Sequence, residues 1–105
     1  METLVRLEKV ISERLDASTE VSYVAKLNSQ GIDRIAQKLG EEATETVVAA
    51  LSGRREEVVR ESADLLFHLL LLLQARRVTL GEVMAELERR EGKSGIEEKA
   101  NREEG

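Results

Sequence analysis

Residues 54–77 read RREEVVRESADLLFHLLLLLQARR. Charged residues fill the first part of this stretch, whereas nearly every position from Leu65 to Leu73 is apolar. A helix over this range carries hydrophobic side chains around its whole circumference, which is typical of a helix that is buried on all sides. A chain of 105 residues with modest helices is too short to surround such a helix alone. We therefore expect two copies to pair, with these helices at the centre of a dimeric bundle.

The rest of the chain also has helical patterning. Leu4, Leu7, Ile11 and Leu15 recur at the spacing of an amphipathic first helix, and glycines mark the expected ends of later helices. Two segments, at Thr79 and Ser94, have the spacing of a capping box. The expected helices run over about residues 2–16, over 21–28, from Ile35 to Gly53, over 54–77, from Thr79 onward, and over a short tail helix from Ser94.

Composition supports an all-α fold, a helical bundle of about five helices. Aromatic residues make up 2% of the chain and there is no proline, while charged residues make up 35%. A domain rich in β-strands usually has more aromatic and turn-forming residues. The length suits a single domain over residues 1–105. The absence of cysteine excludes a disulfide scaffold and a thiolate metal site.

Charge and hydropathy narrow the expected partners and location. The net charge of −5 argues against nonspecific binding to nucleic acid, which relies on a basic surface. The first residues, METLVRLEKV, are charged and helix-patterned, so they do not resemble a signal peptide. The apolar run in residues 65–73 is too short to span a bilayer. We expect a cytoplasmic protein that does not act at a membrane.

Two acidic pairs occupy consecutive predicted helices. Glu42 and Glu45 lie in GEEATE, and Glu61 and Asp64 lie in ESAD. Residues three apart are separated by about 60° on a helix, and each pair borders the apolar face instead of opposing it. A tight turn at Gly53 would bring the pairs face to face. Four converging carboxylates would make a cage for Mg²⁺, a cation that prefers oxygen ligands and often bridges carboxylates to phosphates.

Simpler interpretations exist for each of these residues. Acidic pairs three apart on a helix are common at solvated surfaces, and a lone histidine among leucines, as at His68, is often a satisfied core residue. Gly40, just before the acidic cluster, suggests close approach by a substrate or a neighbouring helix, or is a tolerated helix glycine. Arg54 and Arg55 suit a solvated helix start. Lys26 and Lys38 are better phosphate-binding candidates, as are Lys99 and Arg102.

Ordered sequence blocks resemble the phosphoribosyl-ATP pyrophosphohydrolases of histidine biosynthesis, which belong to the MazG-like all-α nucleotide pyrophosphohydrolases. The superfamily pattern EExxE followed by ExxD is matched at residues 41–45 and 61–64. The narrower family's blocks are matched by SYVAKL (22–27), KLGEEATE (38–45), ADLLFHLL (63–70) and SGIEEKANR (94–102). Phe67 stands where that family usually has tyrosine, and Val24 stands where it usually has threonine.

The resemblance implies hydrolysis of phosphoribosyl-ATP to phosphoribosyl-AMP and pyrophosphate with one or two Mg²⁺ ions. The carried-over catalytic residues and metal ligands are Glu42, Glu45, Glu61 and Asp64, with Glu41 as a further possible ligand. Either Glu42 or Glu45 would position or deprotonate the water. The expected substrate-binding residues are Tyr23, Lys26, Lys38, His68, Lys99 and Arg102.

Two other functions fit parts of the sequence. One is a housecleaning pyrophosphohydrolase that acts on nucleoside triphosphates through the same carboxylates; the SYVAKL and tail blocks favour the histidine pathway instead. The other is a non-catalytic helical dimerisation module whose acidic pairs are solvated. The absence of cysteine and the single histidine argue against a zinc cyclohydrolase activity.

Overall fold

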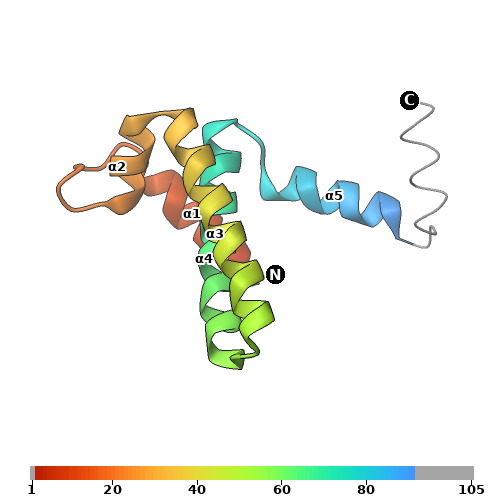
Figure 1. Cartoon of the computed structure of the whole chain (residues 1–105). Helices are drawn as coiled ribbons and strands as arrows, with labels where there is room; N and C mark the ends of the chain where they lie inside the picture. The colour runs from red at the N-terminus through yellow and green to blue at the C-terminus, as the bar shows by residue number, and fades with distance from the viewer. Residues whose placement is uncertain (1, 92–105) are drawn as a thin grey trace.

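The computed structural model describes residues 2–91, which form five α-helices and no strand (Figure 1). The helices are α1 (Glu2–Arg14), α2 (Tyr23–Gln30), α3 (Ile32–Ser52), α4 (Arg55–Ala75) and α5 (Leu80–Arg90). The predicted all-α class is therefore confirmed. The expected tail helix from Ser94 lies outside the described residues, as do Lys99 and Arg102.

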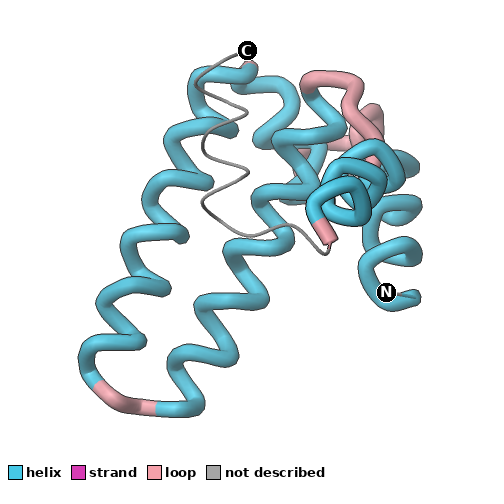
Figure 2. Tube along the Cα trace, turned by 90° about the vertical axis from the view of Figure 1, so that its right-hand side faces the viewer, coloured by secondary structure: helices cyan, strands magenta, loops and turns pink. Residues whose placement is uncertain are grey.

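Helices α3 and α4 form a long hairpin, and their packing is the most extensive between any two helices described (Figure 2). Gly53 ends α3 in a left-handed conformation with φ of 80°. Glycine adopts this conformation without the steric cost that a Cβ imposes, so the chain reverses within a short turn. The expected face-to-face arrangement of the two helices that carry the acidic pairs is confirmed.

Local side-chain chemistry sets the other helix boundaries. Ser22 caps α2 by accepting a hydrogen bond from the Ala25 amide at 3.1 Å. The prediction that this helix begins at Val21 and ends at Asn28 was therefore displaced by two residues at each end. At α5, Thr79 and Glu82 form the predicted capping box, with bonds of 3.1 Å and 2.9 Å between side chains and amides.

One hydrophobic core lies where α1 and α2 pack against the end of the hairpin away from its turn (Figure 1). Its most buried large side chains are Ile11, Ile35 and Leu71. Burying a side chain of this kind stabilises the fold by about 1.5–3 kcal/mol. Glu8 on α1 accepts two hydrogen bonds: its carbonyl accepts from the Gln74 side chain near the end of α4 at 3.0 Å, and its carboxylate accepts from the Leu80 amide at the start of α5 at 2.7 Å.

The described chain leaves part of α4 uncovered. Leu70 and Leu71 are buried, but Leu66 is 44% exposed and Val59 is 63% exposed. This exposure agrees with the prediction, made from the apolar composition of the helix, that one copy of the chain is too short to surround it. Helix α5 projects from the rest of the molecule (Figure 1). No helix within residues 2–91 combines the length and apolar character needed to cross a membrane.

Candidate metal site

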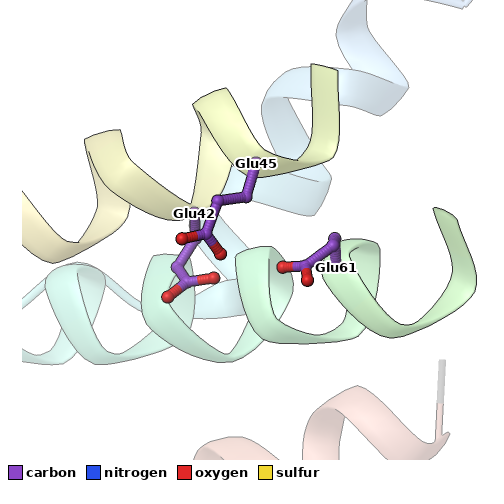
Figure 3. Close-up of side chains that lie close together, drawn as sticks. All are labelled: Glu42, Glu45 and Glu61. Atoms are coloured by element: carbon purple, nitrogen blue, oxygen red, sulfur yellow. The ribbon is translucent and has the colours of Figure 1, made fainter. Parts of the chain in front are cut away.

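Three of the four predicted carboxylates meet between the helices of the hairpin. Glu42 and Glu45 extend from α3 and Glu61 extends from α4, and one oxygen from each lies within 4.8 Å of the others (Figure 3). Glu42 is buried, Glu61 is partly buried, and Glu45 is exposed. The group is therefore anchored inside the helix pair and open on one side.

Two oxygens in this group are buried and have no hydrogen-bond partner within residues 2–91. They are Oε2 of Glu42 and Oε2 of Glu61. Leaving a buried polar atom unsatisfied costs about 1–3 kcal/mol, and more when the group is charged. A hard divalent cation coordinated by these oxygens would remove that cost and the repulsion between the carboxylates. The donor set, all carboxylate oxygen, fits Mg²⁺.

The pKa of Glu61 also reflects the burial and the mutual repulsion of these carboxylates. Burial raises the pKa of the Glu61 carboxyl above its ordinary value, and the neighbouring carboxylate of Glu45 raises it further, with smaller effects from Asp64 and Glu42. Each of these influences disfavours the charged form. Without a cation, Glu61 therefore retains its proton to a higher pH than a solvated glutamate does.

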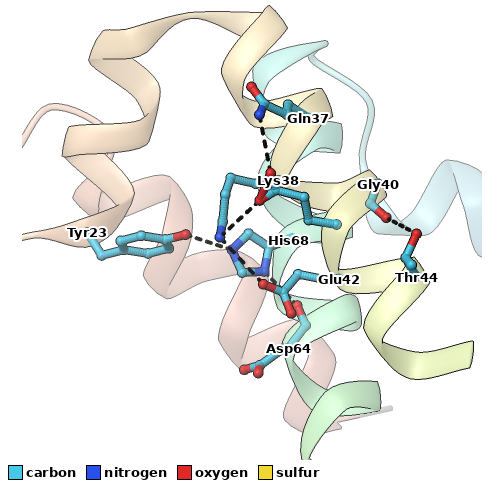
Figure 4. A network of polar contacts seen from close by, with 9 residues as sticks. Tyr23, Gln37, Lys38, Gly40, Glu42, Thr44, Asp64 and His68 are labelled. Atoms are coloured by element: carbon cyan, nitrogen blue, oxygen red, sulfur yellow. Dashed lines mark hydrogen bonds and ion pairs between the residues drawn. The ribbon is translucent and has the colours of Figure 1, made fainter. Parts of the chain in front are cut away.

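Lys38 lies beside the group on α3. Its Nζ is 3.6 Å from Oε1 of Glu42 and 3.6 Å from Oε1 of Glu41 (Figure 4). Burial lowers the pKa of Lys38, but the nearby Tyr23, Glu41 and Glu42 outweigh it and the net pKa is raised. Glu41 points outward, as expected, and accepts a hydrogen bond from Gln37 at 3.2 Å. Lys38 thus places a positive charge at the edge of the acidic group.

Asp64 does not join the three glutamates. Asp64 is exposed, and its carboxylate oxygens do not belong to the group in which oxygens of Glu42, Glu45 and Glu61 lie within 4.8 Å of one another. It lies about 60° around the helix from Glu61, and its side chain is one methylene shorter. The expectation that four carboxylates converge is met by three within residues 2–91, and the role of Asp64 as a ligand stays a prediction.

His68 joins α4 to α2 through one hydrogen bond and makes a second hydrogen bond within α4. Its Nε2 lies 2.8 Å from the Tyr23 hydroxyl, and its Nδ1 lies 2.7 Å from the backbone carbonyl of Asp64 (Figure 4). The ring also packs edge-on against Tyr23 and Phe67. His68 is buried with both nitrogens partnered, which agrees with the interpretation of a satisfied core residue.

Sequence reasoning missed Thr46. Its hydroxyl lies 2.8 Å from the carbonyl of Glu42, one turn earlier on α3, and 3.2 Å from the carbonyl of Glu61 on α4. Thr46 thus links the backbones of two candidate ligands across the hairpin. A threonine between Glu45 and the apolar residues of α3 is the only signal in the sequence, and it does not reveal the contact with α4.

Other predicted residues lie apart from the acidic group. Lys26 is exposed on α2 and forms no ion pair within the described part of the chain. A Cβ added at Gly40 would meet no atom within 4 Å, so contacts inside residues 2–91 do not require this glycine. Open space at Gly40 leaves the backbone accessible to a substrate or to another subunit.

Two surface hollows differ in their relation to the acidic group. A shallow hollow of about 220 Å³ is lined by Glu45 and Glu61 together with Glu57 and neighbouring residues of α3. A larger hollow of about 730 Å³ lies between α1 and the connection from α4 to α5. The larger hollow has no group of converging carboxylates, so the smaller one is the better candidate for chemistry.

Comparison with known proteins identifies the family. The model of the family described as phosphoribosyl-ATP pyrophosphohydrolase matches residues 4–91. The chain belongs to the phosphoribosyl-ATP pyrophosphohydrolase family. That membership confirms the resemblance inferred from the ordered motifs, and the matched range contains Glu42, Glu45 and Glu61.

Individual relatives in this family match along nearly their whole length. The phosphoribosyl-ATP pyrophosphatase of Erythrobacter litoralis is 61% identical over 102 residues, which are 97% of this chain and 98% of the relative. The protein of the same name from Novosphingobium aromaticivorans is 60% identical, over 96% of this chain and 94% of the relative. The protein of the same name from Dinoroseobacter shibae is 51% identical, over 97% of this chain and 100% of the relative.

Proposed function

We propose that this chain hydrolyses phosphoribosyl-ATP to phosphoribosyl-AMP and pyrophosphate, the second step of histidine biosynthesis, in the cytoplasm. The observation that carries the proposal is the group of three carboxylates with two unpartnered buried oxygens. Family membership and the names of the relatives supply the substrate.

Glu42, Glu45 and Glu61 are the proposed Mg²⁺ ligands, with Asp64 as an additional ligand. The bound cation would neutralise charge on the phosphate oxygens and lower the pKa of a coordinated water. The buried Glu42, which pairs with Lys38, and the partly buried Glu61 form the inner part of the site. The proposal allows one or two ions.

In the proposed reaction, water attacks the α-phosphorus of the triphosphate. A bond forms between phosphorus and the water oxygen, and the bond from phosphorus to the bridging oxygen breaks, so that pyrophosphate leaves with the electron pair. Glu45 is better placed than Glu42 to accept the proton of the water, because it is exposed while Glu42 is buried and pairs with Lys38. Lys38 would bind a phosphate oxygen at the edge of the acidic group.

A substrate panel tests this function. Pyrophosphate release in the presence of Mg²⁺ would be measured with phosphoribosyl-ATP and with the common nucleoside triphosphates. We expect release from phosphoribosyl-ATP to dominate. A preference for nucleoside triphosphates would support a housecleaning enzyme, and no release from any substrate would support a non-catalytic module. In ¹⁸O-labelled water the label should enter phosphoribosyl-AMP, and label in pyrophosphate would contradict attack at the α-phosphorus.

We also propose that the enzyme is a homodimer that pairs through α3 and α4. Val59 and Leu66 are seven residues apart on α4, hence on one face, and both are exposed. On α3, Leu51 is 83% exposed and Val47 is 57% exposed, again on one face. Apolar surface of this kind on the helices of the hairpin suits a second copy of the same bundle.

A further inference from the structure

The contacts of His68 determine where the hydroxyl proton of Tyr23 points. The Nδ1 atom of His68 lies 2.7 Å from the Asp64 carbonyl oxygen, and a carbonyl oxygen can only accept. Nδ1 therefore carries a proton and donates it. In the neutral imidazole the other nitrogen, Nε2, has no proton and must accept. Its partner at 2.8 Å is the Tyr23 hydroxyl, so Tyr23 is the donor in that bond.

A hydroxyl has one proton, and in Tyr23 that proton is donated to Nε2 of His68. The remaining lone pairs of the oxygen can only accept hydrogen bonds. Within residues 2–91 the hydroxyl has no second hydrogen-bond partner, and the residue is 47% exposed. Figure 4 shows the hydroxyl on the side of the acidic group where Lys38 lies. Tyr23 thus presents an acceptor, not a donor, at the edge of the candidate site.

Phosphate oxygens of a nucleotide at neutral pH are acceptors, so this hydroxyl is unsuited to bind them. We infer that Tyr23 accepts a hydrogen bond from a ribose hydroxyl or an amino group of the nucleotide, and that His68 is a positioning residue that holds the Tyr23 proton away from the substrate. This inference rests on the proposed function. It separates two residues that the sequence placed together as substrate-binding: Tyr23 contacts the substrate, and His68 acts through Tyr23.

Kinetics of matched variants test the assignment. For Tyr23→Phe we expect KM for phosphoribosyl-ATP to rise about three- to tenfold, the effect of one neutral hydrogen bond, with kcat nearly unchanged. Inhibition by magnesium pyrophosphate, which has no ribose hydroxyl and no amino group, should be unchanged. Weaker inhibition by pyrophosphate in Tyr23→Phe would show that Tyr23 donates to phosphate and would overturn the inference, as would an unchanged KM.

Two variants of His68 separate positioning from packing. His68→Gln retains an acceptor that can reach the Tyr23 hydroxyl, whereas His68→Leu removes both polar contacts. We expect His68→Gln to keep a KM close to that of the native protein and His68→Leu to match Tyr23→Phe. Equal KM values for both His68 variants, at equal melting temperature, would contradict the positioning role.

The protonation of the His68 ring can also be measured in the native protein, without any substitution. The chain has one histidine and one tyrosine, so ¹⁵N NMR of the imidazole gives unambiguous signals. We expect the proton on Nδ1, with Nε2 unprotonated. A proton on Nε2 would overturn the inference. This result does not depend on turnover, so a protein without activity would refute the proposed function while the NMR still decides the direction of the Tyr23 hydrogen bond.

Discussion

Glu42 of α3 and Glu61 of α4 bring carboxylate oxygens within 4.8 Å of each other, and the Oε2 atom of each is buried without a hydrogen-bond partner in the described part of the chain. Thr46 links the backbone carbonyls of both residues across the same helix pair. Repulsion between the two side chains is therefore built into the most extensive helix contact of the fold. A cation between them would stabilise the hairpin as well as assist chemistry.

Mg²⁺ should raise the melting temperature of the protein. At a concentration 100-fold above the dissociation constant, binding to the folded state contributes about 2.7 kcal/mol. For a domain of this size that corresponds to roughly 10 °C or more. Calorimetry with and without Mg²⁺ measures it. Glu61→Gln should lose most of the shift, and Glu88→Gln, an exposed change on α5, should keep it. Equal shifts in both variants would place the cation elsewhere.

The stability of the metal-free protein should depend on the charge of Glu61. Its pKa is raised in the folded state above the ordinary 4.5, so the folded state holds the proton more tightly than the unfolded state does. The resulting stability is fully present below the ordinary pKa and is lost as pH rises through the raised pKa. In a chelating buffer, the melting temperature of the native protein should fall relative to Glu61→Gln as pH rises from about 4 to about 7. A difference that does not change with pH would contradict the raised pKa.

Lys38 should contribute more to substrate binding than Lys26. Lys38 lies 3.6 Å from Glu42 at the edge of the acidic group, while Lys26 is exposed on α2 without an ion pair within the described residues. Replacing Lys38 with Met should raise KM about tenfold or more, because a charged hydrogen bond is worth about 1.5–3 kcal/mol. Lys26→Met is the matched control, with little change expected. The reverse order in steady-state kinetics would move the phosphate site to α2.

Charge introduced on the exposed face of α3 should dissociate the proposed dimer. Leu51 and Val21 are equally exposed in one copy, at 83% and 81%, but only Leu51 lies on the hairpin. Sedimentation at micromolar concentration should give the mass of two chains for the native protein and for Val21→Glu. It should give the mass of one chain for Leu51→Glu. A native protein with the mass of one chain would refute the dimer.

Much of the fold was predictable because the signals are local. The capping box at Thr79 and the end of α3 at Gly53 depend on a few neighbouring residues, and both predictions are confirmed. The start of α2 was misplaced because Val21 was counted as helical, although Ser22 is the residue whose side chain caps the helix. Contacts between helices that are distant in the sequence were harder to predict. The apolar composition of α4 indicates that this helix is buried, but it does not show which neighbouring surface covers it.

The candidate site was predictable in its membership and not in its geometry. Helical spacing placed Glu42, Glu45 and Glu61 on facing strips, and the structure brings these together. The same spacing did not exclude Asp64, because angle on a helix ignores side-chain length. The contacts of Thr46 and the bond between Tyr23 and His68 join different helices and depend on their relative placement. No periodicity in one helix encodes such contacts.

The most direct test of the central claim is Mg²⁺-dependent turnover of phosphoribosyl-ATP by the native protein and by Glu45→Gln. Glu45 is exposed, so the substitution should leave the helical circular dichroism unchanged. The account predicts rapid pyrophosphate release by the native protein and almost none by the variant. Turnover by Glu45→Gln above about a tenth of the native rate, a barrier change of less than about 1.4 kcal/mol, would contradict the catalytic role of the acidic group.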